Sequence, residues 1–308
     1  MKLKLSALAV ASAVLLAGCN DSSNDTTDRD KPPAEVSGVK IAFMPDIHFH
    51  DVFGDFKDGS FDGLYNSITG KGATIRTMQS QMESTRLFNE NYFAMIAALD
   101  DVVERGIKHV ALPGDFSDDG QPVHMRGLVE IFDHYAEKYD LEFFAASGNH
   151  DPTRPFSISN GKRDYLGEGG KEQRIYSRGS NGCDGYAGDW TIIHGEWDLP
   201  QVCTEEVQEW GYKEIMDILA SHGFHPTPDH FYFETPYSSQ GARDHYRYET
   251  AYVESKFENR FFEICHEGTG GDYKKEGYTS CSMVPDTTYL VEPIEGVWLT
   301  ALVTLVTT

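Results

Sequence analysis

Three short apolar runs, each followed at once by a polar motif, constrain the fold of this chain more than any other feature. The runs cover residues 39–44, 109–113 and 141–146, and their length and apolar character predict buried strands. The motifs after them read Asp46-Ile47-His48, Gly114-Asp115-Phe116-Ser117-Asp118 and Gly148-Asn149-His150-Asp151. Ligands bind at the carboxyl ends of the strands in an open α/β sheet, so the three motifs are expected to line one crevice.

Two helices are predicted between these strands. Apolar residues recur at helical spacing over residues 88–99, which predicts a helix over about residues 84–105 that ends before Gly106. A second helix is predicted over residues 122–138. This alternation of strands and helices predicts an α/β fold with parallel strands and right-handed crossovers. The polar segment 51–81 is interpreted as an active-site loop.

The motifs contain side chains that bind divalent metal ions in proteins. Asp46 and Asp115 offer carboxylates, His48 an imidazole and Asn149 an amide oxygen. This ligand set suits zinc, manganese or iron, and the lack of a thiolate in the motifs argues against a structural zinc site. The sequence therefore predicts a metal centre. The alternative is that Asp46 and His48 are strand-end residues bonded to loop amides.

In this order the motifs resemble those of the calcineurin-like metallophosphoesterases, whose blocks read D-x-H, G-D-x-x-D, G-N-H-D/E, a lone His and G-H-x-H. The resemblance covers residues 39–151. It implies an α/β fold of the metallophosphoesterase type, an αββα sandwich. It also implies two divalent metal ions and hydrolysis of phosphomono- or phosphodiesters by a hydroxide that these ions hold.

The resemblance assigns a role to each predicted metal ligand. Asp46 and His48 correspond to ligands of the first metal ion. Asp115 corresponds to the carboxylate that bridges both ions, and Asn149 to a ligand of the second ion.

The resemblance also implies catalytic residues. His150 corresponds to the catalytic histidine, which stabilises or protonates the leaving oxygen, with Asp118 as its orienting partner. Asp119 stands where the family often has an arginine that contacts phosphate, so this chain departs from the pattern there. The alternative for His150 is a structural histidine whose partner is Asp151.

The last histidine motifs of the family have no convincing counterpart. Nothing after Asp151 reads G-H-x-H, and residues 289–291 and 297–302 are predicted to form two strands joined at residues 293–296. We therefore expect a truncated or frame-altered member of the family with an incomplete C-terminal part. The remaining candidates for substitute ligands are His194, His222, His225, His230 and His245.

Two functions remain open on this basis. The first is a metal-dependent phosphoesterase that acts on small-molecule or lipid-headgroup phosphate esters, weakened or inactivated in this chain by the missing ligands. The second is a non-catalytic cell-surface binding lipoprotein that retains the fold.

The charge of the chain bears on its partners. Lys and Arg total 26 against 49 Asp and Glu, which gives a net charge of -23. Such a field repels nucleic acid and anionic membranes, so neither is expected as a partner. It also repels phosphate esters, so bound cations must supply the local attraction.

The N-terminus is predicted to be a targeting segment. Lys2 and Lys4 precede an apolar run over residues 5–17 that is too short to span a membrane. The run closes with Leu16-Ala17-Gly18-Cys19, which resembles the bacterial lipoprotein box and implies cleavage before Cys19 and lipid attachment to its sulfur. An ordinary secretory signal is the alternative.

The predicted targeting segment and the family resemblance divide the chain into three parts. Residues 1–18 are the signal peptide, 19–37 a flexible tether, and 38–308 the phosphoesterase domain with 152–286 as an insertion that caps the cleft. The expected location is the bacterial cell envelope, lipid-anchored, with Asn20 favouring the outer membrane facing periplasm or exterior. Contact with the membrane is expected only through the lipid anchor.

Four further cysteines, Cys183, Cys203, Cys265 and Cys281, predict disulfides in an exported chain. Three pairings are possible, and the sequence-local pairs Cys183–Cys203 and Cys265–Cys281 are favoured over a thiolate metal site.

The second half has weaker patterns. It predicts a loop over residues 165–189, a strand over 189–194 and a helix over 204–222 that Thr204 caps.

Overall fold

The computed structural model describes residues 38–241, 243–265 and 281–302. The chain divides into two units, Met1–Val39 and Lys40–Thr308, and the fold described below is that of the second unit. Cys19, the predicted signal peptide and the tether lie outside the described residues. No helix within the described ranges is long and apolar enough to cross a bilayer.

The three strands predicted in the first half form one parallel sheet. They are β1 (Ile41–Phe43), β4 (His109–Pro113) and β5 (Glu142–Ala146), in the order β1-β4-β5. His109 pairs with Ile41 on one side and with Glu142 on the other, so β4 is the central strand. All three strands run the same way, and their carboxyl ends therefore meet at one edge of the sheet.

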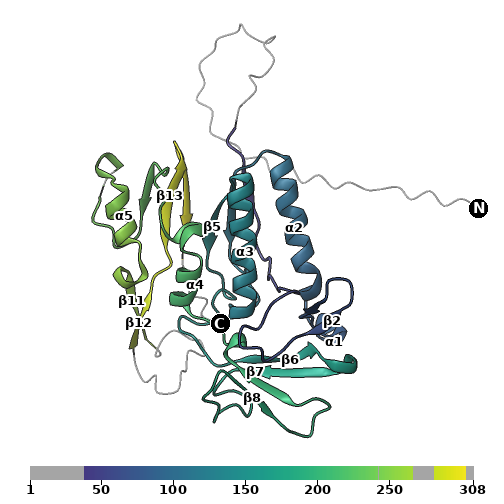
Figure 1. The fold of residues 1–308 in the computed structure, drawn as a ribbon. Helices are drawn as coiled ribbons and strands as arrows, with labels where there is room; N and C mark the ends of the chain where they lie inside the picture. Colours follow the sequence, from purple (N-terminus) through teal and green to yellow (C-terminus); the bar gives the residue numbers. More distant parts are fainter. Residues whose placement is uncertain (1–37, 242, 266–280, 303–308) are drawn as a thin grey trace, which may run out of the picture. The chain divides into compact units, whose positions relative to one another are not determined.

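Two long helices connect these strands. They are α2 (Phe88–Glu104) and α3 (Pro122–Tyr139), labelled in Figure 1. Helix α3 has proline in its first turn and ends at Asp140 in the left-handed conformation, as helix termini favour. The apolar faces of both helices enter one core, which includes Leu99 of α2 and Phe132 of α3. The predicted β-α-β-α-β order is confirmed.

The polar segment between β1 and α2 contains regular structure that the sequence did not reveal. It forms the antiparallel pair β2 (Leu64–Asn66) and β3 (Lys71–Ala73), followed by the short helix α1 (Met78–Glu83). The Asn66 side-chain oxygen accepts hydrogen bonds from the backbone N–H groups of Ile68 and Thr69, which closes the turn between the two strands.

A second, antiparallel sheet packs on the first. It consists of β10 (Tyr232–Glu234), β13 (Tyr289–Ile294) and β14 (Val297–Ala301), and the β13–β14 hairpin confirms the two strands predicted there. The Tyr289 hydroxyl donates to the Ala145 carbonyl oxygen of β5 at 2.9 Å, and its ring stacks on Phe233. Two sheets and the covering helices make the mixed α/β fold that the resemblance implies.

The loop predicted over residues 165–189 is wrong in its first part. Strands β6 (Gly161–Leu166) and β7 (Glu172–Tyr176) form a hairpin there, and with β9 (Gln201–Thr204) and β8 (Trp190–Ile193) they make a four-stranded sheet in the order β6-β7-β9-β8. The glycines that indicated a loop lie in the hairpin turn, where Gly169 and Gly170 have positive φ.

The single helix predicted over residues 204–222 is also wrong. The chain instead forms a 3₁₀ turn, η2 (Glu205–Val207), then α4 (Tyr212–Ile218) and a π-helical turn, η3 (Ala220–Phe224). Thr204 does act as a cap, because its hydroxyl accepts a hydrogen bond from the Glu206 N–H, but it caps the 3₁₀ turn. Gly211 interrupts the helix, since a Cβ there would lie 2.6 Å from the Phe156 backbone.

Residues 152–286, predicted as an insertion, contain more than the four-stranded sheet. They also contain α4 and β10, whose residues Ile215 and Phe233 belong to the same apolar core as α2 and α3. The later part of this range is thus built into the main fold.

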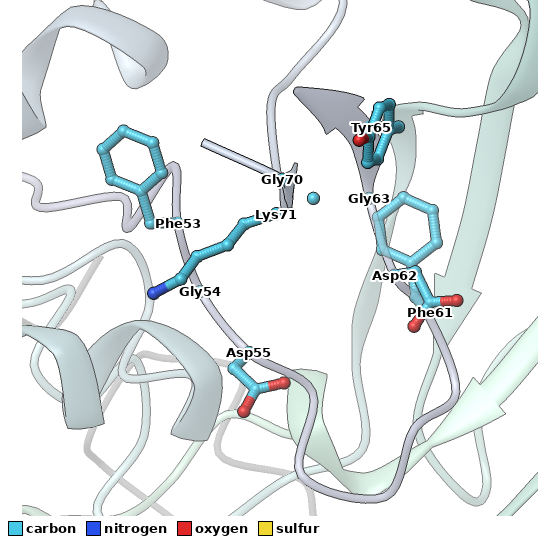
Figure 2. Close-up of a pocket in the computed structure, with 10 residues that line it drawn as sticks. Phe53, Gly54, Asp55, Phe61, Asp62, Gly63, Tyr65, Gly70 and Lys71 are labelled. Carbon is cyan, nitrogen blue, oxygen red and sulfur yellow. The ribbon is translucent and has the colours of Figure 1, made fainter. Parts of the chain in front are cut away.

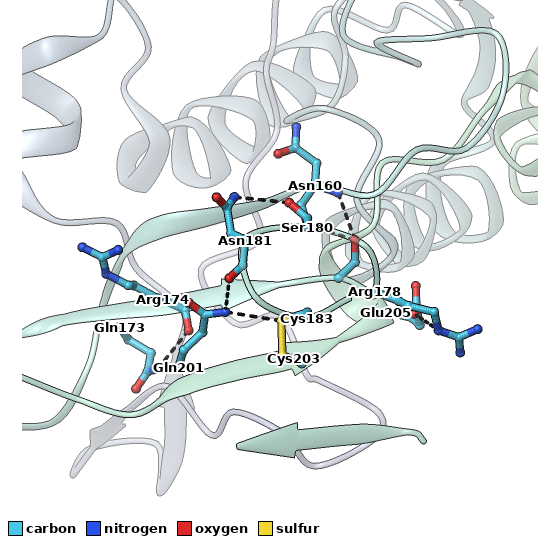
Figure 3. The surroundings of a disulfide bond; sticks show 11 residues. Asn160, Gln173, Arg174, Arg178, Ser180, Asn181, Cys183, Gln201, Cys203 and Glu205 are labelled. Atoms are coloured by element: carbon cyan, nitrogen blue, oxygen red, sulfur yellow. Dashed lines mark hydrogen bonds and ion pairs between the residues drawn. A yellow bond between two sulfur atoms is a disulfide. The ribbon is translucent and has the colours of Figure 1, made fainter. Parts of the chain in front are cut away.

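The predicted Cys183–Cys203 disulfide is present, with 5.7 Å between the two Cα atoms. Figure 3 shows that it ties the loop after β7 to β9. The Gln201 side-chain amide donates to the Asn181 carbonyl oxygen at 2.7 Å and contacts the Cys183 sulfur at 3.3 Å. Both cysteines are fully buried, so the bond forms the centre of a small core of its own.

The other predicted disulfide stays a prediction. Strands β11 (Phe261–Cys265) and β12 (Cys281–Pro285), which follow helix α5 (Tyr248–Glu254), pair so that Cys265 lies opposite Cys281 in the backbone register. The side chains of these two cysteines lie outside the described residues.

Replacing both Cys183 and Cys203 by serine is expected to lower the free energy of unfolding by about 3 kcal/mol, because the bond closes a loop of 20 residues. Urea unfolding of the oxidised wild type and the double variant measures this difference. Under reducing conditions the wild type should approach the variant. Equal unfolding midpoints under oxidising conditions would contradict the prediction.

Candidate metal centre

The segments that follow β1 and β4 run side by side beyond the strands themselves. The Asp46 N–H donates to the Gly114 carbonyl oxygen at 3.1 Å, and the His48 N–H donates to that of Asp115 at 2.8 Å. Ligand atoms of Asp46, His48 and Asp115 consequently all lie within 4.8 Å of one another, at the partly exposed edge of the sheet. The structure brings together these three predicted ligands.

The backbone at these three residues is strained. Asp46, His48 and Asp115 have φ values of 53°, 44° and 53°, in the left-handed region that residues other than glycine rarely adopt. Each such conformation costs on the order of 1 kcal/mol and persists only where the surrounding structure imposes it. Half of the six described non-glycine residues with positive φ are these candidate ligands, and such clustering is typical of a functional site.

The donor set fits divalent metal ions. Among the described residues no hydrogen-bond partner contacts the Asp46 carboxylate, and His48 Nδ1 is closed off from solvent without a partner. The alternative in which these side chains bond to loop amides is therefore not what the structure shows. Burial and the nearby Arg86 lower the pKa of His48, so its ring is neutral and able to act as a ligand.

The third motif folds directly onto Asp115. The His150 N–H donates to Asp115 Oδ1 at 2.9 Å, and a Cβ at Gly148 would lie 2.3 Å from the same oxygen, so only glycine fits. Asn149 is exposed in this turn, and its role as a ligand stays a prediction.

Asp151 ties the second motif to the third. Its carboxylate is fully buried and accepts hydrogen bonds from the N–H groups of Phe116, Ser117 and Gly148, at 3.0, 2.7 and 3.2 Å. Both oxygens are engaged by these groups, so Asp151 is not the partner of the His150 ring. Its function is to fix the two turns that carry the candidate ligands.

The His150 ring contacts Asp119 instead of Asp118. Its Nδ1 lies 2.5 Å from Asp119 Oδ1, and its Nε2 lies 2.6 Å from Arg86 Nη2. Although burial lowers the pKa of His150, the hydrogen bond and charge of Asp119 raise it above its ordinary value. The His150 ring also lies beside that of His48, with 5.1 Å between centroids.

Asp118, predicted to orient His150, lies beneath the site. It is fully buried and bonds to Arg76 Nη1 at 3.0 Å, Arg86 Nη1 at 3.3 Å and His50 Nδ1 at 3.4 Å. The carboxylate that contacts the His150 ring is that of Asp119. The backbone turns sharply here, and Asp119 has a positive φ of 62°. The prediction chose the wrong one of two adjacent carboxylates because spacing does not reveal which of them points outward.

The four-stranded sheet supplies charges to this network. Lys162 and Asp164 lie on the same side of β6, since alternate residues of a strand share a face. Lys162 bonds to Asp119, and Asp164 accepts two hydrogen bonds from Arg76, at 2.8 and 2.6 Å. No local sequence pattern marks the charged residues of this network, so none of them could be predicted: Arg76, Arg86, Lys162 and Asp164.

A second group of metal-ligating atoms is better explained as a hydrogen-bond network. His50, Asp118 and His124 are fully buried, and their ligand atoms also lie within 4.8 Å of one another. Every ring nitrogen has a protein partner: His50 contacts Asp118 and the Thr74 carbonyl oxygen, and His124 contacts the Asp51 N–H and the Tyr165 hydroxyl. The Arg76 guanidinium on Asp118 also disfavours a further cation.

The histidines considered as substitute ligands do not join the candidate centre in the described part of the chain. His222, His225 and His230 contact Asp133, Ser255 and Glu142 respectively. His194 and His245 are exposed.

Comparison with known proteins agrees with this geometry. Residues 39–273 match the model of the calcineurin-like phosphoesterase family, which is well over half of the chain. The protein therefore belongs to the calcineurin-like phosphoesterases, a family that typically binds divalent metals. A comparison with curated proteins gave no match.

Replacing Asp115 by alanine is expected to abolish divalent metal binding, because its carboxylate lies between the other candidate ligands and the third motif. Isothermal titration with Mn²⁺ and metal analysis after dialysis measure this. Asp101→Ala, at an exposed acid of α2, is the matched control and should bind metal like the wild type. Equal metal content in Asp115→Ala and wild type would remove Asp115 from the centre.

Replacing Lys162 by methionine is expected to lower the free energy of unfolding by about 3 kcal/mol or more at neutral pH, because it leaves buried carboxylates without their cation. Burial raises the pKa of Asp119, but Lys162 and His150 outweigh it and hold that pKa at about 2. The stability this contributes is complete above the ordinary pKa of 3.8 and is lost as the pH falls toward 2.

The difference between wild type and Lys162→Met should therefore stay constant at neutral pH and shrink in strong acid. Urea unfolding at a series of pH values measures it. Lys57→Met is the control, since Lys57 pairs with Asp55 on the exposed surface and should change stability little. A difference that grows as the pH falls would refute this account.

Proposed function

We propose that this protein hydrolyses phosphate esters, either phosphomonoesters or phosphodiesters, with the help of divalent metal ions. The observation that carries the proposal is the convergence of Asp46, His48 and Asp115, on strained backbone, at the edge of the parallel sheet. Family membership supports the same class of reaction. The candidate substrates are small molecules or lipid headgroups that carry a phosphate ester.

Asp46, His48 and Asp115 hold the metal ions in this proposal, with Asn149 completing the second position. When bound, zinc, manganese or iron supplies a water of lowered pKa as nucleophile and neutralises charge on the phosphate. The chain contributes a rigid frame, because Asp151 fixes the turns that carry Asp115 and Asn149.

His150 assists the departure of the leaving group. Its Nδ1 is held by Asp119, so the proton that it delivers is the one on Nε2. Arg86 Nη2 lies 2.6 Å from Nε2 and can only donate, so Arg86 has to move away when Nε2 carries this proton. The raised pKa of His150 favours the protonated ring that such a transfer needs. Asp119, in turn, is held by Lys162, so the four-stranded sheet helps to position the ring.

Arg86 binds the substrate phosphate. Its side chain is 18% exposed, whereas that of Arg76 is 5% exposed and engaged by Asp118 and Asp164. The Arg86 contacts with Asp118 and Asp119 are longer, at 3.3 and 3.6 Å. Its short contact with His150 Nε2 is lost when that nitrogen is protonated, which frees the guanidinium for a phosphate. In this role it replaces the arginine that the family often has where this chain has Asp119.

A non-catalytic binding lipoprotein is the second candidate function. It is favoured by the incomplete ligand set, since the group of candidate ligands at the sheet edge consists of Asp46, His48 and Asp115 and no further histidine of the described residues joins it. Both candidate functions are compatible with the proposed lipid anchor at Cys19 and the proposed outer-membrane location.

Hydrolysis of p-nitrophenyl phosphate and bis-p-nitrophenyl phosphate, in the presence of Mn²⁺ or Zn²⁺, tests the enzyme against the binding protein. His150→Ala is expected to lower kcat about 10²-fold or more while metal remains bound. Arg86→Ala should mainly raise KM, and Arg86→Lys should restore part of the binding. Metal binding without turnover of either substrate would favour the binding protein.

A further inference from the structure

A cavity of about 360 Å³ lies between helices α2 and α3 and the loop after β1. It has the size of a small-ligand site, and none of the candidate metal ligands lines it. Its wall combines two acids, Asp51 and Glu130, and the bases Lys71 and His134 with the rings of Phe53, Tyr92 and Tyr135. No role in the proposed hydrolysis involves any of these residues.

The Asp51 carboxylate lacks a partner for one of its oxygens. Oδ1 accepts a hydrogen bond from the Phe53 N–H at 2.9 Å, but Oδ2 has no hydrogen-bond partner among the described residues. The residue as a whole is only 8% exposed, but Oδ2 is not closed off from solvent, so this oxygen is open to the cavity. A buried carboxylate with an unused oxygen is unfavourable unless something else neutralises it.

The helix beside Asp51 leaves room for this carboxylate. Gly127 lies in the interior of α3, where glycine costs about 1 kcal/mol relative to alanine. A Cβ at Gly127 would lie 2.0 Å from Asp51 Oδ2, so a larger residue is incompatible with the position of the carboxylate. The glycine therefore allows Oδ2 to lie against the helix backbone at the wall of the cavity.

The basic residues nearby do not neutralise Asp51. Lys71 lines the cavity but forms no ion pair with Asp51 in the described structure. In Figure 2, which shows the neighbouring cavity, the Lys71 side chain extends past Gly54 and is shared between the two spaces. Arg126 is engaged by Glu206 and by the Asp55 carbonyl oxygen. Burial and the charge of Glu130 consequently raise the pKa of Asp51 to about 6.

The aromatic wall suits an organic cation. Phe53 and Tyr92 meet edge to face, with 5.2 Å between centroids, and Tyr135 donates its hydroxyl proton to Asp100 at 2.7 Å. Ring faces attract alkylammonium groups, whereas a metal ion would need more oxygen ligands than Asp51 and Glu130 supply.

We propose that this cavity binds a small organic cation, an alkylammonium or quaternary ammonium group, with Asp51 as its counter-ion and Phe53 and Tyr92 as its aromatic wall. The ligand makes an ion pair with the free oxygen of Asp51 and replaces water at the ring faces. Glu130 adds long-range attraction from the rim.

Binding of choline, monitored by isothermal titration and by shifts of protein NMR signals, tests this inference on the full chain. The wild type is expected to bind choline with a millimolar Kd and its uncharged isostere 3,3-dimethyl-1-butanol about tenfold or more weakly. Asp51→Asn should weaken choline binding about tenfold, and Tyr92→Leu should weaken it as well.

Two controls separate binding from folding. Asp55→Asn changes an exposed acid of the neighbouring cavity and should bind choline like the wild type. Asp51→Asn removes an unpaired buried charge, so its melting temperature at neutral pH should be no lower than that of the wild type. Equal binding of choline and its isostere, unchanged binding in Asp51→Asn, or no binding by the wild type would each overturn the proposal. None of these results depends on phosphoesterase activity.

Discussion

The backbone hydrogen bonds between the segments after β1 and β4 are the constraint on which the candidate site depends. They continue the parallel pairing past the strand ends, from Met44 with Ala111 to Phe49 with Phe116. Because Asp46 and His48 lie within this extended ladder, their positions relative to Asp115 are set by the main chain. The side chains contribute little to their own placement, which explains how three unfavourable φ values are tolerated together.

Electrostatics beneath the site forms a second layer of organisation. Asp118 and Asp119 are adjacent, largely buried and negatively charged, and they persist because Arg76, Arg86 and Lys162 surround them. Burial raises the pKa of Asp118, but Lys162, His50 and Arg76 together hold it well below its ordinary value. In a chain with a net charge of -23, these three cations balance the three acids beneath the site, Asp118, Asp119 and Asp164.

The parts of the fold that could be predicted are those in which a local sequence pattern is compatible with only one kind of secondary structure. Strand β4 and helix α3 follow directly from an apolar run and from apolar residues at helical spacing. The segment from Thr204 to His222 was mispredicted because tertiary contacts at Gly211 override its helical character. The hairpin of β6 and β7 was not predicted because the glycines of its turn are typical of a loop, and because charged residues on β6 face the buried network instead of solvent.

Local sequence patterns also predicted only part of the candidate site. Motif order identified Asp46, His48 and Asp115 as neighbours, since strand ends of a parallel sheet must meet. Which carboxylate contacts His150 could not be read from spacing, because Asp118 and Asp119 differ only in the direction that the turn gives them. Arg86 and Lys162 come from segments far apart in the chain and carry no pattern of their own.

The attachment of β6 to this network limits how the four-stranded sheet can move. Lys162 and Asp164 each hold a charge that would lose its partner if the strand were lifted away from Asp119 and Arg76. A rigid-body rotation of the whole sheet would therefore break both ion pairs at once and leave the charged groups without partners. The opposite margin of the sheet, at β8, has no charged residue among Trp190–Ile193, so a displacement there leaves the ions under His150 undisturbed.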